Sequence, residues 1–251
     1  SKVLKDQLAV LAMIEDHVAH QDKVLPEWLR ERWTKKGIPT KAITECLAWY
    51  CAHDAPFLRK IIHVRTKLLS KRNNIRVLFS KEEDARSKRT LKQDLEVYEY
   101  LYVHLKDVYG KMSNYKRDMR RIFCNMSLLK KHMPDWSEER LKNVITFNDL
   151  LIRRSAGAKM NVGPCVGYDD IPILIRIIQV KNGGLVDYET NNVYHYDHIF
   201  VDEAQDFGAV ALKVLMSTVR SRTGVTIVGD KNQKIFHSSK FVAWSSIAKE
   251  L

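Results

Sequence analysis

Apolar residues recur at intervals of three and four through most of the first 145 residues, which is the spacing of one face of an α-helix. This spacing predicts helices over residues 3–19, 41–53, 56–71 and 114–131, and a long helix that ends near Gly110. Pro26 predicts the start of a separate helix over residues 27–35. Residues 75–79 are compatible with a short strand, and Ser80 followed by Glu83 predicts a capping box for the long helix.

The pattern changes after residue 145. Asn148 is a candidate cap for a helix that runs to Arg154, and the glycines and Pro164 of residues 155–167 predict a loop. Residues 171–180 are very apolar and leave two interpretations open. They form either a strand that enters a hairpin turn at residues 182–184 and returns over 185–188, or a short buried helix with Pro172 in its first turn.

Two short apolar runs, at residues 198–201 and 225–228, are each followed by acidic residues. Such runs predict strands buried on both faces of a parallel sheet, and residues 208–220 between them predict a helix. Ligands of open α/β sheets bind beyond the carboxyl ends of the strands. We therefore expect one edge of the sheet to gather the polar residues that follow the two runs, namely Asp202, Glu203, Asp230 and Gln233.

The residue types at this edge favour phosphate chemistry. A carboxylate at a strand end can hold Mg²⁺, and a second carboxylate can orient or deprotonate an attacking water. A glutamine on the neighbouring strand end can respond to the presence of a terminal phosphate. The competing interpretation of the acidic residues is an ordinary solvated loop after a strand.

Residues 201–206, Val-Asp-Glu-Ala-Gln-Asp, resemble motif II (the Walker B element) of UvrD/Rep-like superfamily 1 helicases. Residues 228–236 are similar to motif III of these helicases, and residues 145–151 resemble the segment where their chain re-enters the motor domain. The resemblance implies the cofactors ATP and Mg²⁺. It assigns the metal to Asp202, activation of the attacking water to Glu203 and phosphate sensing to Gln233. Further polar residues would support the nucleotide site: Gln205, Asp206 and Asp230.

The resemblance predicts an α/β fold, with a partial RecA-like parallel sheet of the P-loop NTPase type preceded by a mainly helical, basic region. We expect an N-terminal helical region over residues 1–79 and a helical, insertion-like subdomain over 80–145. A partial motor domain with motifs II and III would follow over 146–251. In the family, the helical insertion contacts duplex or displaced strand.

Parts of a complete motor are absent from these residues. No Gly-x-x-x-x-Gly-Lys-Ser/Thr phosphate cradle occurs, and the second motor domain with its arginine is missing. Motif III also departs from its pattern, because residues 237–240 read His-Ser-Ser-Lys where the family continues with an aromatic residue, Arg and Gly. We therefore expect one part of an ATP-dependent, UvrD-like DNA helicase that is inactive alone.

Three explanations of these gaps remain open. The chain is a fragment or one piece of a longer or split helicase, or a degenerate helicase-like module that binds nucleic acid or protein without catalysis, or an unrelated basic module. The intact Asp202, Glu203 and Gln233 favour the first explanation, as does the end at Leu251 soon after motif III.

The composition favours nucleic acid as the partner. The 251 residues contain 42 Lys and Arg against 30 Asp and Glu, giving a net charge of +12, which favours polyanions, and DNA over RNA given the motifs. A generally basic, soluble surface is the alternative. No apolar run predicts a membrane span or a signal peptide, so an intracellular location is expected, in the cytoplasm, nucleoid or nucleus.

Cysteines and tyrosines are two further groups of side chains that can carry chemistry. The four cysteines predict no disulfide framework, and Cys46, Cys51 and His53 do not have the spacing of a zinc site. The tyrosines of the long helix, at positions 98, 100, 102 and 109, suit either stacking on bases or packing between helices, and packing is favoured.

Overall fold

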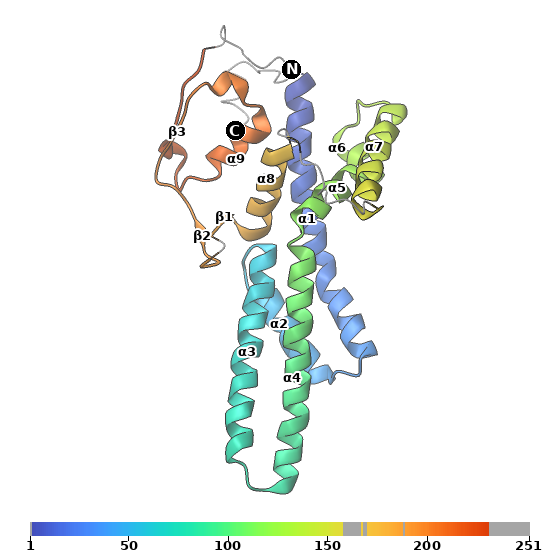
Figure 1. The fold of residues 1–251 in the computed structure, drawn as a ribbon, viewed down its shortest axis with the longest axis vertical. Helices are drawn as coiled ribbons and strands as arrows, with labels where there is room; N and C mark the ends of the chain where they lie inside the picture. The colour runs from blue at the N-terminus through green and yellow to red at the C-terminus, as the bar shows by residue number, and fades with distance from the viewer. Residues whose placement is uncertain (1, 158–166, 168–169, 188, 231–251) are drawn as a thin grey trace. The chain divides into compact units, whose positions relative to one another are not determined.

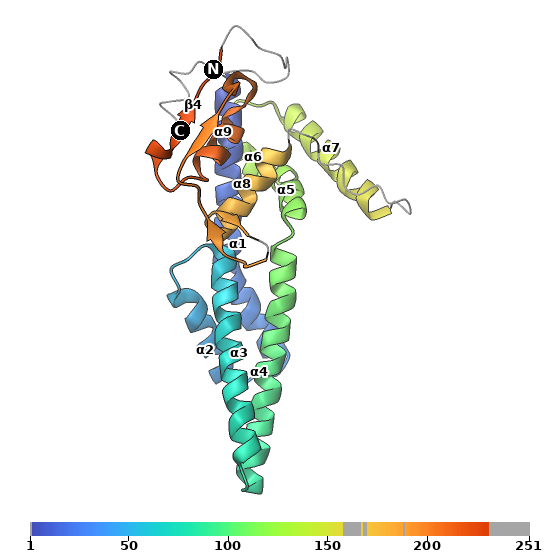
Figure 2. The same ribbon diagram turned by 60° about the vertical axis from the view of Figure 1, so that its left-hand side comes forward.

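The structure is a computed structural model that describes residues 2–157, 167, 170–187 and 189–230. The chain divides into two compact units, one made of residues 1–18 and 115–251 and the other of residues 19–114. The first helix, α1 (Lys2–Lys35), contributes its first half to one unit and its second half to the other. Figure 1 and Figure 2 show the elements of each unit.

The unit of residues 19–114 is helical throughout the described chain. It contains the second half of α1, then α2 (Thr40–Ala52), α3 (Phe57–Lys81) and α4 (Ala85–Met112). The last two form an antiparallel hairpin (Figure 1). Its core includes five residues of α3 and α4 that are at most 2% exposed and lie at helical spacing: Ile61, Val64, Leu68, Leu101 and Leu105. The predicted end of the long helix near Gly110 is correct to within two residues.

Three local predictions in this unit are wrong. Pro26 lies inside α1, which continues because Leu25 and Leu29 are both buried beside it. Residues 75–79 belong to α3, not to a strand, and only one of them, Ile75, is buried. The cap of α4 is Asp84, whose Oδ2 accepts from the backbone N–H of Ser87 at 2.7 Å. Ser80 instead donates its hydroxyl to the Val77 carbonyl within α3.

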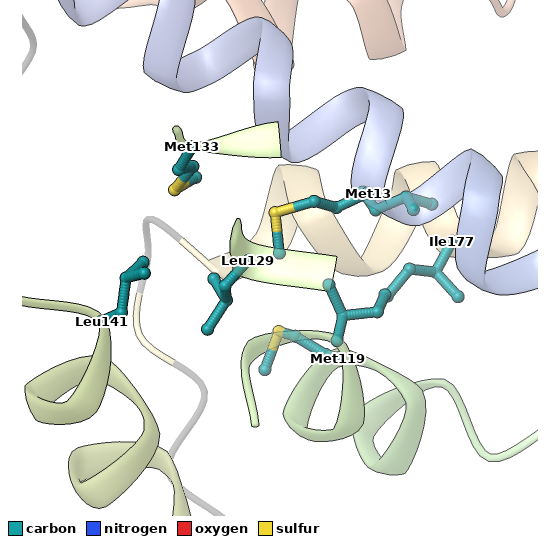
Figure 3. Packing of buried hydrophobic residues seen from close by; sticks show 8 residues of the cluster. Met13, Met119, Leu129, Met133, Leu141 and Ile177 are labelled. Atoms are coloured by element: carbon teal, nitrogen blue, oxygen red, sulfur yellow. The ribbon is translucent and has the colours of Figure 1, made fainter. Parts of the chain in front are cut away.

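The other unit packs the first half of α1 against a set of shorter helices. These are α5 (Tyr115–Phe123), α6 (Met126–His132), α7 (Glu138–Gly157) and α8 (Ile171–Asn182). Their core contains three methionines and is shown in Figure 3: Met13, Ile14, Met119, Ile122, Leu129, Met133, Leu141 and Ile177. The predicted helix over residues 114–131 is divided, because Asn125 caps α6 by accepting from the Leu128 N–H at 3.1 Å.

The structure decides between the two interpretations of residues 171–180. They form the helix α8, with Pro172 in its first turn and Gly183 closing it in the left-handed conformation (φ 83°). Residues 182–184 therefore end a helix and do not form the hairpin turn. The following strands, β1 (Leu185–Val186) and β2 (Val193–Tyr194), pair antiparallel.

Residues 145–151, which resemble the segment where the helicase chain re-enters the motor domain, lie within α7. Asn148 is not a helix cap, because it is in the interior of α7 and its Nδ2 donates to the Val144 carbonyl at 2.9 Å. Its Oδ1 accepts from Arg120 of α5 at 3.2 Å, so it fastens α7 to α5.

The described part of the chain is mainly helical, with two small two-stranded sheets, β1–β2 and the pair formed by β3 (Ile199–Val201) and β4 (Val225–Ile227). It is therefore more helical than the predicted α/β class. The predicted boundary near residue 80 falls in the last turn of α3, and the division into three functional regions stays a prediction. None of the described helices has the length and hydrophobicity that crossing a membrane requires.

Candidate active site

The site forms where two parallel strands end. β3 and β4 pair in parallel, with Ile199 opposite Val225 and Val201 opposite Ile227. The backbone ladder continues past them, since Val228 N–H donates to the Val201 carbonyl at 2.9 Å and Ala204 N–H to the Val228 carbonyl at 3.0 Å. The residues that follow both strands are therefore held at one edge, as the sequence predicts.

Burial of β3 differs from the prediction. Val201 is buried, but Phe200 is 80% exposed. Successive side chains of a strand point to opposite faces. Ile227, opposite Val201, packs with α9 (Ala209–Met216) and the start of α1, so Phe200 faces the other side. Among the described residues, β3 is buried on one face and not on both.

The helix between the strands is shorter than the predicted range of residues 208–220. α9 ends at Met216, and a turn at residues 217–218 leads to a single bridge residue, Val219. Tyr196 N–H donates to the Thr218 carbonyl at 2.8 Å, and Arg220 N–H donates to the Tyr196 carbonyl at 3.0 Å. These bonds form a parallel bridge between Tyr196 and Val219. Thr218 and Val219 are β-branched, and such residues favour extended backbone over helix.

Glu203 has an uncommon backbone conformation at the end of β3. Its φ is 50° and its ψ is 37°, the left-handed region that non-glycine residues rarely adopt. The Asp202 carboxylate accepts from the Glu203 N–H at 2.8 Å and stabilises this turn. Strained residues of this kind cluster at functional sites. The side chains of Asp202 and Glu203 are both exposed.

Gln205 connects the two strand ends. Its side chain is fully buried. The amide Nε2 donates to Oε2 of Glu203, and Oε1 accepts from the Asp230 N–H at 3.0 Å. The bridge requires glycine at position 229, because a Cβ there would lie 2.5 Å from the Gln205 Oε1. Gln205 therefore sets the position of the Glu203 carboxylate relative to the end of β4.

A residue from the start of the chain holds the segment that follows the acidic turn. Oε1 of Gln7, on α1, accepts from the Ala209 N–H at 2.7 Å, at the first turn of α9. Gly208 allows this approach, because a Cβ at that position would lie 2.9 Å from Gln7 Nε2. The two residues are 202 positions apart, and no local pattern in the sequence indicates the contact.

Beside this segment lies a cavity of about 630 Å³ within the same unit. Its lining is mostly apolar and includes Val10, Leu129, Met133, Trp136, Ile173 and Val214. Asp206 also lines it, and its Oδ1 is buried with no hydrogen-bond partner among the described residues.

The structure thus brings together Asp202, Glu203, Gln205 and Asp230. Gln233 and residues 237–240 lie outside the described residues, so the phosphate-sensing position of motif III stays a prediction. No group of three metal-ligating side chains occurs among the described residues. Mg²⁺ needs fewer protein ligands, because it is held by one or two carboxylates together with phosphate oxygens and water. The exposed carboxylates after β3 fit that donor set.

The chain matches the family described as UvrD/REP helicase N-terminal domain over residues 5–239. It belongs to the UvrD/REP helicase family. The match includes both the helical unit and the strands with their acidic ends. UvrD/REP helicases bind nucleic acid and use ATP and Mg²⁺. No curated protein and no solved structure matches the chain.

Proposed function

We propose that the ends of β3 and β4 form the acidic part of the Mg-ATP site of a UvrD-like DNA helicase, on a partial RecA-like sheet of the P-loop NTPase type. The observation that carries this proposal is the buried Gln205 bridge, which holds the Glu203 carboxylate relative to the Asp230 backbone. A solvated loop has no need of a fully buried amide that joins two strand ends.

Each residue of the edge has a distinct part in this proposal. Bound Mg-ATP supplies the phosphoryl group and the metal charge. Asp202 would ligate the metal, while Glu203 would orient the attacking water or accept its proton. Gln205 keeps Glu203 in place, and Asp230 adds negative charge at the end of β4. Gln233 senses the terminal phosphate.

The chain by itself is expected to hydrolyse ATP negligibly, because its 251 residues contain no glycine-rich cradle with a lysine to hold the phosphates. The remaining parts of the site would come from the rest of a larger or split helicase. ATP turnover by this chain that is stimulated by DNA and abolished by Glu203→Gln would refute the expectation.

Metal binding tests the assignment of Asp202 directly. Mn²⁺ is a paramagnetic substitute for Mg²⁺, and with ATP present it should broaden the amide resonances of residues 202–204 in the wild-type protein. Asp202→Asn should greatly weaken this broadening, because a neutral amide replaces the charged carboxylate ligand.

Asp197→Asn is the matched control, because Asp197 is an exposed carboxylate just before β3, at the opposite end of the strand. It should leave the broadening unchanged. Equal broadening in the wild type and in Asp202→Asn would contradict the metal assignment. If nucleic-acid affinity then remained salt-sensitive and unaffected by changes at Asp202 or Glu203, the chain would be a helicase-like binding module without catalysis.

A further inference from the structure

The unit of residues 19–114 carries three aromatic rings in a near-parallel stack, here called the ring stack: Trp28 on α1, and His104 and Tyr100 on α4. The Trp28 and His104 ring centroids are 6.1 Å apart with an interplanar angle of 19°. The His104 and Tyr100 centroids are 5.8 Å apart with an angle of 3°. These values are those of offset-stacked rings.

A hydrogen bond from a buried indole fixes the middle ring of the ring stack. Trp33 is fully buried, and its Nε1 donates to His104 Nδ1 at 2.9 Å. Neutral His104 consequently carries its proton on Nε2. Burial and the nearby Arg32 lower the pKa of His104, so the ring stays neutral at neutral pH. A fixed, uncharged ring in the middle keeps the stack rigid before any partner arrives.

The ends of the ring stack are basic. The Arg32 guanidinium lies 5.6 Å from the centroid of the Trp28 ring, and Lys36 Nζ lies 5.8 Å from that of Tyr100. Lys35, adjacent to Lys36, is exposed, and so is Lys111, two turns after His104 on α4. Cations therefore stand beside the rings, at the distances that cation–π contacts require.

Tyr100 differs from the other tyrosines of α4. Tyr98 is buried and donates its hydroxyl to Glu45 at 2.8 Å. Tyr102 and Tyr109 share the guanidinium of Arg65, at 5.6 Å from each ring centroid. These three pack against α2 or α3, as the packing interpretation predicts. Tyr100 instead belongs to a group in which Trp28 remains 41% exposed, and the neighbouring Val24 and Val103 are 44% and 46% exposed.

We propose that the ring stack is a base-stacking platform for single-stranded nucleic acid, with Arg32 and Lys36 contacting the adjoining phosphates. Aromatic rings beside cations are the combination that binds unpaired bases without reading their sequence. A protein partner fits the apolar surface but not the cations at both ends. This second site uses no residue of the strand edge. It rests on the proposed function only in that a DNA helicase has nucleic acid as its partner.

The test compares two fluorescein-labelled single strands of about 16 nucleotides, which is within the range of known single-strand sites, one of them lacking its bases. Fluorescence anisotropy without ATP gives the affinity of the whole chain for each. The wild type should bind the strand with bases roughly tenfold more tightly than the abasic strand. Equal affinity for both, or no binding to either, overturns the proposal, and the second result leaves a protein as the partner of the ring stack.

Variants then locate the effect. Trp28→Ala and Tyr100→Ala should each weaken binding of the strand with bases roughly tenfold and leave the abasic strand unaffected. Phe79→Ala is the matched control, since Phe79 also has a cation over its ring (Lys88, 5.4 Å) but lies at the far end of α3. Equal losses for both strands in Trp28→Ala would overturn the proposal. The wild-type comparison stands even if a variant fails to fold.

The test of the ring stack can fail or succeed independently of the test of the proposed ATP site. Asp202→Asn should leave the preference for bases intact, because it changes only the strand edge. Loss of Mn²⁺ broadening together with a retained preference for bases would mean that each site behaves as assigned. A preference for bases without any metal site would leave the platform standing and refute only the proposed ATP site.

Discussion

The two units differ in how deeply their described charged side chains are buried. In the unit of residues 19–114, cations lie over aromatic rings near the surface. Lys71 contacts Glu45 at 2.5 Å and lies 4.7 Å from the Tyr98 ring centroid. In the other unit, one cation is fully buried: Lys181 of α8 donates to Asp118 of α5, with neither side chain more than 4% exposed. His17 of α1 contacts the other Asp118 oxygen at 3.3 Å.

The depth of burial determines how much stability is lost when one member of an ion pair is replaced. A partly exposed cation that loses its partner regains water, so the loss is small. A buried charge that loses its partner has no water to replace it. The unit that carries the acidic strand ends is therefore also the one in which single polar side chains are hardest to replace.

The largest expected effect is at the buried pair. Lys181→Met leaves the Asp118 carboxylate buried without its main cation, which should lower the free energy of unfolding by about 3–5 kcal/mol. Denaturation in urea, followed by circular dichroism, measures it. Lys142→Met is the control, because Lys142 is exposed and pairs with Glu138 on the surface of α7, where a loss of less than about 0.5 kcal/mol is expected.

A double variant distinguishes loss of the ion pair from loss of packing by the lysine side chain. Asp118→Asn in the Lys181→Met background removes the buried negative charge that has lost its lysine, and should recover a large part of the lost stability. If the double variant were no more stable than Lys181→Met alone, the loss would come from packing of the lysine stem, and the contrast between the units would fail.

The second prediction compares two glycines, one in each unit. Gly229→Ala forces a methyl group to 2.5 Å from the Gln205 amide oxygen, so it should lower the free energy of unfolding by about 1–3 kcal/mol. Gly110→Ala, in the last turns of α4, meets nothing within 4 Å and should raise it by roughly 0.5–1 kcal/mol through helix propensity.

Thermal unfolding of both variants checks the opposite signs. Gly229→Ala should also displace the Asp230 amide resonance, because that amide donates to Gln205. A variant with unchanged stability and an unchanged Asp230 resonance would show that the bridge adapts without strain.

The smallest expected effect depends on pH and lies in the helical unit. Burial lowers the pKa of both His63 and His104 below the ordinary value of 6.5. Below pH 6.5 the unfolded chain therefore binds protons that the folded chain does not, so these residues reduce stability as the pH falls through that value. The melting temperature should drop by a few degrees between pH 7 and pH 5.

His104→Gln keeps an acceptor for Trp33 but cannot titrate, so it should make this dependence shallower. Because other groups titrate in both proteins, the difference between the two pH profiles isolates His104. Identical profiles for the variant and the wild type would contradict the assignment.

Sequence reasoning succeeded where the determinants are local. The spacing of leucines located the long helix of α4 to within two residues at its end, and two apolar runs with acidic ends located a parallel strand pair. It failed where a distant contact overrides a local signal. Pro26 did not end α1, because the buried Leu25 and Leu29 keep the chain helical around it. Residues 171–180 have no decisive local signal, since apolar runs of that length suit either class.

The residues of the candidate site also divide into those that local sequence predicts and those that depend on distant contacts. Asp202, Glu203 and Asp230 follow directly from the ends of the strands, because parallel strands deliver their carboxyl ends to one edge. The role of Gln205 as a buried bridge did not follow, since a side chain's burial depends on how the turn folds back onto β4. Gln7 could not be found at all, because it comes from the other end of the chain.

The bond from Gln7 to Ala209 has a consequence for how the protein is made. The helix that offers the acceptor is synthesised about two hundred residues before the amide whose hydrogen bond it accepts. The turn bearing the acidic pair cannot be clamped until nearly all of the described chain has been synthesised. A nascent chain stopped before α9 would thus have its earlier helices, but Gln7 would not yet hold the segment that follows the acidic turn.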